Sequence, residues 1–171
     1  MGGRSGSFRS KAGGGAIGTL NGTKEEIAEA EKIRQPYLKA LKKLDNMKDT
    51  MVRDLNSDTL SKVYKGIRTA RGETPEGAMA KHWAPWYYDT NDSVSKDISN
   101  IRSKNNFSDW DITSLGQKIN SGKVSKQAGL AEAHNRMNKT NHDLYSFFKS
   151  EGQKALSHKD AKWWIKNKKN F

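Results

Sequence analysis

The chain has 171 residues, and its 31 lysines and arginines outnumber its 19 aspartates and glutamates, giving a formal net charge of +12 at pH 7. It contains no cysteine, which excludes disulfide scaffolds and cysteine-ligated zinc and favours a cytoplasmic or within-virion setting. No apolar run is long enough to span a bilayer, so we expect no membrane partner. The excess positive charge predicts nucleic acid, or an acidic or nucleoprotein assembly, as partner.

Residues 1–22 hold eight of the fifteen glycines and no acidic residue. Because glycine loses much backbone entropy on ordering, we expect this segment to be a flexible, disordered arm. Its positive charges, predicted to contact nucleic acid or a partner, are Arg4, Arg9 and Lys11. If neighbouring subunits ordered the arm, the protein would instead be a virion or head-assembly component.

Residues 23–171 are predicted to form a single all-α domain, an irregular bundle of about six helices. Thr23 and Glu26 have capping-box spacing, and apolar residues then recur at helical spacing through residues 27–55. Pro36 falls inside this pattern and predicts a kink or a division into two helices.

Ser57 is predicted to begin the next helix, and Gly72 to end it. Apolar residues share one arc of this helix. The opposite arc carries Lys62, Lys65 and Arg68, with Arg71 near the border, and these four basic residues are predicted to contact phosphates or a partner.

Thr74 and Pro75 predict the start of a short helix that Pro85 ends. The stretch "KHWAPWYYDT" around that proline has two open interpretations. It could be a base-stacking platform, or a set of aromatic plugs for a thin core. The candidate binding residues here are Lys81, Trp83, Trp86 and Tyr87.

Four further helix starts follow, predicted at Ser93, at Ser108 with Asp111, at Ser125, and at Ser157 with Asp160. Gly122 and Gly152 are predicted to end the second and third of these helices. The longest, from Ser125, has a predicted apolar face of Ala128, Ala131, Met137, Leu144, Tyr145 and Phe148.

The C-terminal sequence "AKWWIKNKKNF" combines two adjacent tryptophans with several lysines. Neighbouring helical residues point about 100° apart, so we expect one tryptophan to dock on the core and the other to lie near the lysines. This arrangement suits nucleic acid, although a solvated lysine face is an equally simple interpretation. The candidate binding residues are Lys162, Trp163, Trp164, Lys166, Lys168 and Lys169.

No catalytic motif is present, and we expect no enzyme activity, no metal and no cofactor. His134 and His142 are eight residues apart on one predicted helix, about 12 Å along its axis, which is too far to share a metal ion. A small ribonuclease-like toxin using His82, His134 or His142 remains an open alternative.

The opening "MGGRSGS" resembles the Gly/Ser/Arg-rich starts of small proteins from bacteriophage head-morphogenesis cassettes. That resemblance implies a phage gene product that acts in a virion or against a host defence system. Together with the clustered charge, it favours a non-enzymatic, basic, helical protein that engages nucleic acid or a nucleoprotein complex.

Overall fold

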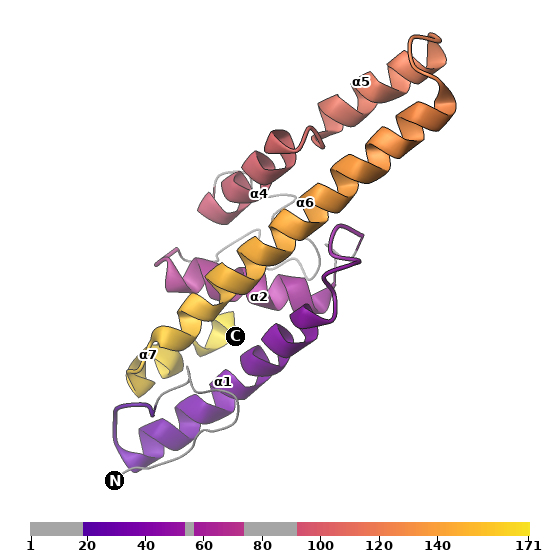
Figure 1. Cartoon of the computed structure of the whole chain (residues 1–171). Coiled ribbons are helices and arrows are strands. Elements are labelled where there is room, and N and C mark those ends of the chain that lie inside the picture. Colours follow the sequence, from indigo (N-terminus) through magenta and orange to yellow (C-terminus); the bar gives the residue numbers. More distant parts are fainter. Residues whose placement is uncertain (1–18, 54–56, 74–91) are drawn as a thin grey trace.

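The computed structural model describes residues 19–53, 57–73 and 92–171, and helices dominate them (Figure 1). The all-α prediction is confirmed for this part of the chain, where the only extended pairing is an isolated β-bridge between Asn21 and Asp160. The helices are α1 (Lys24–Asp45), α2 (Asp58–Ala70), α4 (Ser93–Lys104), α5 (Asp109–Asn120), α6 (Lys126–Lys154) and α7 (Ala161–Lys166), with single 3-10 turns η4 (Ala155–Ser157) and η5 (Lys168–Asn170). The helix predicted from Thr74 lies outside the described residues.

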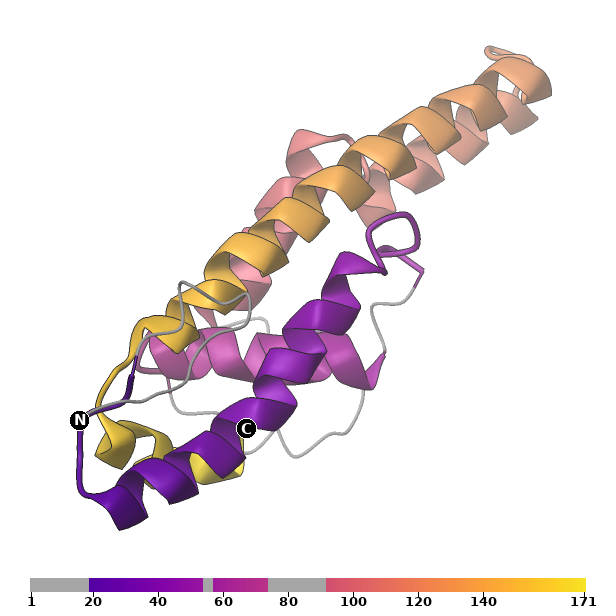
Figure 2. The same ribbon diagram turned by 60° about the horizontal axis from the view of Figure 1, so that its bottom comes forward.

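Helix α6 runs along the length of the molecule (Figures 1 and 2). Near its C-terminal end, α1 and α2 pack against it and against each other, and α7 packs against α1. Towards its N-terminal end, α5 returns along it as a helical hairpin, which projects away from α1, α2 and α7. None of the helices in the described residues is both long and apolar enough to cross a bilayer.

The predicted helix starts are largely confirmed because their signals are local. Thr23 accepts from the backbone N–H of Glu26, whose carboxylate accepts from the N–H of Thr23 in return. Ser57, Ser108 and Ser125 each cap their helix through a side-chain oxygen. The predicted start at Ser93 is confirmed, because α4 begins there, with Asp92 as its cap. One assignment is wrong: Asp160 alone caps α7, while Ser157 lies in η4.

The first predicted helix is shorter than its apolar pattern. The helix ends at Asp45, and Met51, which lies in the turns that follow, is buried in the core. Pro36 lies inside α1 without dividing it. Leu55 lies outside the described residues.

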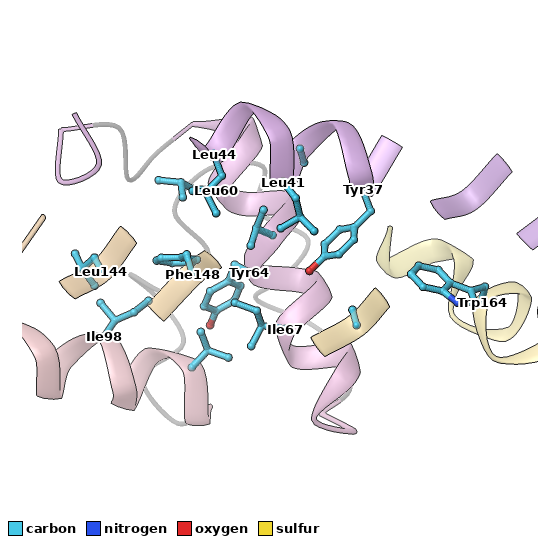
Figure 3. Packing of buried hydrophobic residues seen from close by; sticks show 14 of the residues in the cluster. Tyr37, Leu41, Leu44, Leu60, Tyr64, Ile67, Ile98, Leu144, Phe148 and Trp164 are labelled. Atoms are coloured by element: carbon cyan, nitrogen blue, oxygen red, sulfur yellow. The ribbon is translucent and has the colours of Figure 1, made fainter. Parts of the chain in front are cut away.

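The core centres on Tyr37, at the crossing of α1, α2 and α6 (Figure 3). Its ring is fully buried, and its hydroxyl donates a 2.6 Å hydrogen bond to the carbonyl of Gly152. Both Gly66 and Gly152 allow this approach: an added Cβ would lie 2.2 Å from the Tyr37 ring at position 66 and 2.9 Å from Leu41 at position 152. The prediction that Gly152 ends its helix is therefore wrong, since this glycine serves packing inside α6.

The predicted apolar face of α6 is confirmed only in its C-terminal half. Leu144 and Phe148 are fully buried, whereas Ala128 and Ala131 are exposed. In the N-terminal half α6 packs on α5 through Gly129, where an added Cβ would meet Ile119 at 2.4 Å. A glycine contact of this kind has no hydrophobic signature in the sequence.

Candidate nucleic-acid interface

The last fourteen residues form a folded unit, residues 158–171, which we name the C-terminal cap. Trp164 anchors it: this side chain is fully buried, and its indole Nε1 donates to the His158 carbonyl at 2.9 Å. The Trp164 ring also packs against Phe171, with ring centroids 4.7 Å apart. The cap therefore rests on α1 through an apolar inner side.

Backbone pairing with the start of the described chain holds the beginning of the cap. Asn21 donates its N–H to the Lys159 carbonyl at 2.6 Å and accepts from the N–H of Ala161 at 2.9 Å. The Asp160 carboxylate caps α7 by accepting from the N–H of Lys162 at 3.0 Å. These contacts fix the direction in which the side chains of α7 leave the backbone.

The outer side of the cap is covered by lysines. Five of them are exposed: Lys159, Lys162, Lys166, Lys168 and Lys169. Lys162 is 4.0 Å from the carboxylate of Glu26, and its side chain is 73% exposed. An ion pair this long and this exposed contributes little free energy, so it does not compete strongly with a phosphate for Lys162.

The same cap contains a stacked aromatic pair. Trp163 and His158 stack with ring centroids 3.7 Å apart and planes 2° apart, and both are half-buried. Partial burial lowers the pKa of His158 below the ordinary 6.5, which favours the neutral imidazole. The predicted division of the two tryptophans is confirmed in part: Trp164 is in the core, whereas Trp163 is half-buried and also packs against the core, so its place near the lysines stays a prediction.

Arg34 adds a positive charge beneath the cap. Its guanidinium lies 5.6 Å from the Trp164 ring centroid and donates to Glu31 at 3.0 Å. Burial lowers the pKa of Arg34, although Glu31 acts in the opposite direction. This cation is 1% exposed and its charge is offset by Glu31, so it supports the cap from beneath without meeting a ligand directly.

The exposed basic arc predicted on α2 is wrong. Arg68 is 6% exposed and lies 3.9 Å from the carboxylate of Asp92, which also accepts from the Tyr64 hydroxyl. Arg71 bonds to Asp97 at 2.8 Å and to Glu151 at 3.2 Å. Both arginines thus connect α2 to other helices, because acids from α4 and α6 face the arc that looked solvated. Lys62 and Lys65 are half-buried.

The two histidines of the enzyme alternative that the structure describes do not form a common site. His134 and His142 are both exposed on α6, and only His134 lines the shallow hollow of about 270 Å³ between α6 and the turns after α1. That hollow is lined by Asp49, Thr50, Val52, Arg53, His134, Met137, Asn138 and Asn141. Within the described ranges, no three His, Asp or Glu side chains converge as metal ligands would.

The remaining predicted binding residues lie outside the described ranges. They are the arm residues Arg4, Arg9 and Lys11, and the aromatic-stretch residues Lys81, His82, Trp83, Trp86 and Tyr87. Their roles stay predictions, and so does the choice between stacking platform and core plug.

The α5–α6 hairpin was not predicted from the sequence as a candidate binding surface. Trp110, in the first turn of α5, is 74% exposed, and Leu130 on α6 is 49% exposed. Between residues 112 and 131 the sequence has three lysines and no acid, which is the signal that could have drawn attention to it.

Comparisons with protein-family models, curated proteins and solved structures find no match for this chain. The functional argument therefore depends on the residues and their arrangement.

Proposed function

We propose that this is a phage-encoded, non-enzymatic protein that binds nucleic acid, free or within a nucleoprotein complex, through its C-terminal cap. The observation that carries the proposal is the two-sided construction of the cap. Trp164 fixes the inner side to the core, and five exposed lysines cover the outer side.

The chemistry of this surface fits a polyanion. Lysine ammonium groups neutralise phosphates and release condensed counterions, a gain that does not depend on base sequence. The half-buried Trp163 and His158 rings present an aromatic surface in the same cap, and such surfaces stack on unpaired bases or pack against sugars. Contacts with phosphates carry no sequence information, so binding through these lysines is predicted to be largely independent of sequence.

The short N-terminal resemblance supports a phage origin, and the protein then acts in the host cytoplasm or in the virion. A basic protein that covers nucleic acid, or competes for the nucleic-acid groove of a host defence complex, is compatible with this surface. In both uses the cap lysines make the primary contact, either with a phosphate backbone or with an acidic protein surface in its place.

The test is a binding titration of fluorescently labelled DNA and RNA, single-stranded and duplex, at low salt. The triple variant Lys162→Gln, Lys166→Gln, Lys169→Gln removes cap charge from exposed positions and leaves the Trp164 anchor in place. We expect affinity to fall at least tenfold.

The charge-matched control is Lys39→Gln, Lys42→Gln, Lys48→Gln, at exposed positions on α1 and the turn after it. It has the same net charge as the cap variant and should bind within about threefold of the wild type. Equal losses in the two variants would mean that only net charge matters, and would reject the cap as the site.

A further inference from the structure

A second basic surface lies at the other end of α6, at the tip of the α5–α6 hairpin (Figure 1). Its three lysines, Lys118, Lys123 and Lys126, are all exposed. No acidic residue occurs between residues 112 and 131, so nothing within the tip neutralises them.

The two acidic residues that flank the tip in the sequence, Asp111 and Glu132, are held by contacts within their own helices. Asp111 accepts from the hydroxyl and the N–H of Ser108 in the cap of α5. Glu132 is paired with Arg136 at 2.8 Å. Both acids are therefore held back towards the base of the hairpin, and the tip presents positive charge.

The tip is held rigidly relative to the rest of α6. Gly129 brings α5 so close to α6 that an added Cβ would overlap Ile119 at 2.4 Å, and Val124 packs beside the same site. The lysines thus project from a packed helical hairpin, not from a free loop.

The two basic ends are separated by the length of α6. This helix has 29 residues, and a rise of 1.5 Å per residue makes it about 44 Å long. Base pairs are stacked 3.4 Å apart, so this length corresponds to about 13 base pairs of duplex.

Ion pairs within the described residues offset the charge of two of the three acids of α6, Glu132 and Glu151, whereas Asp143 keeps its charge. Glu151 is paired with Arg71 at 3.2 Å and with Lys154 at 2.8 Å. Asp143 accepts from the Asn105 amide at 2.9 Å.

We infer that the hairpin tip and the C-terminal cap bind one nucleic-acid duplex together, with the duplex lying along α6. A duplex is the class of ligand that fits, because it is stiff over this length and carries phosphates at both ends of the span. This inference rests on the proposed function, since it takes the cap as the first contact. Binding at the second end is then intramolecular, which raises the affinity without any new type of contact.

The test compares random-sequence DNA duplexes of two lengths by fluorescence anisotropy at low salt. A duplex of about 8 base pairs spans about 27 Å and reaches only one end, whereas one of about 24 base pairs reaches both. The tip variant is Lys118→Gln, Lys123→Gln, Lys126→Gln. We expect it to lose at least tenfold affinity for the long duplex and about twofold for the short one.

Two results would overturn the bivalent arrangement. One is a tip variant that binds the long duplex as the wild type does. The other is an equal loss on both lengths, which would make the tip an independent site.

Failure of the proposed function has a different signature. The wild type would bind neither duplex, or the cap variant would bind both duplexes as tightly as the wild type. Circular dichroism of each variant establishes that the helices are intact.

Discussion

Replacing Gly66 by alanine should destabilise the protein, although the same change usually stabilises a helix. The new Cβ would lie 2.2 Å from Tyr37 Cε1 and 2.6 Å from its hydroxyl oxygen. Non-bonded carbon atoms pack at about 3.5–4.0 Å, so the buried ring has to move by more than about 1 Å. That movement breaks the hydrogen bond from Tyr37 to the Gly152 carbonyl.

The magnitude follows from three contributions. Helix propensity favours alanine by about 1 kcal/mol. Overpacking a dense core costs about 1–3 kcal/mol, and an unmet buried polar group costs a further 1–3 kcal/mol or so. The net loss is therefore about 1–5 kcal/mol in the free energy of unfolding, equivalent to roughly 2–20 °C in Tm for a chain of this length.

The assay is urea unfolding followed by circular dichroism, with Gly116→Ala as the matched control. Gly116 lies inside α5, and an added Cβ there would meet no atom within 4 Å. Gly116→Ala should raise the free energy of unfolding by up to about 1 kcal/mol. If Gly66→Ala is as stable as Gly116→Ala, the close packing of Tyr37 against α2 is wrong.

Three further predictions follow from the buried network, the cap and the histidines. Asp92→Ala removes a buried carboxylate and the cap of α4, so it should lower the free energy of unfolding, measured in urea, by about 3–5 kcal/mol. The control Asp109→Ala breaks an exposed ion pair and should change this free energy by less than about 0.5 kcal/mol. Burial lowers the pKa of His158 in the folded state, so the unfolded chain binds protons first as the pH falls. The contribution of the neutral His158 to the free energy of unfolding should therefore be complete above about pH 6.5 and decline below it. In urea titrations at several pH values, His158→Gln should remove this part of the decline. If the protein harms its host on expression, His134→Ala and His142→Ala should leave growth inhibition unchanged, and relief by either one would support the nuclease alternative instead.

The helix framework was predictable where the signals are local. Thr23, Ser57, Ser108 and Ser125 bond to backbone N–H groups within their own first turn, so the identity of each residue is enough to place a helix start. Asp160 shows the limit, because two capping residues occur close together and the structure uses only the second.

Contacts between distant segments could not be predicted. On a helical wheel Lys62 and Lys65 lie opposite the main apolar residues of α2, whereas Arg68 lies on the flank and Arg71 near the border of the apolar arc. The two arginines are buried or half-buried because Asp92, Asp97 and Glu151 approach from α4 and α6. No periodicity within α2 contains that information.

The candidate site was predictable in part. The angle between adjacent helical residues predicts that only one of Trp163 and Trp164 docks centrally on the core, and Trp164 is the one that is fully buried. The hairpin tip was missed because its lysines are spread over residues 118–126. They become one surface only when α5 folds back on α6.

The most direct test of the account is the salt dependence of duplex binding by the wild type, the cap variant and the α1 control. On a plot of log affinity against log salt concentration, each lost phosphate contact reduces the slope by about 0.9. The account predicts that replacing Lys162, Lys166 and Lys169 by glutamine makes the slope shallower by about two to three, while the control keeps the wild-type slope. Identical slopes for all three proteins would contradict phosphate binding by the cap.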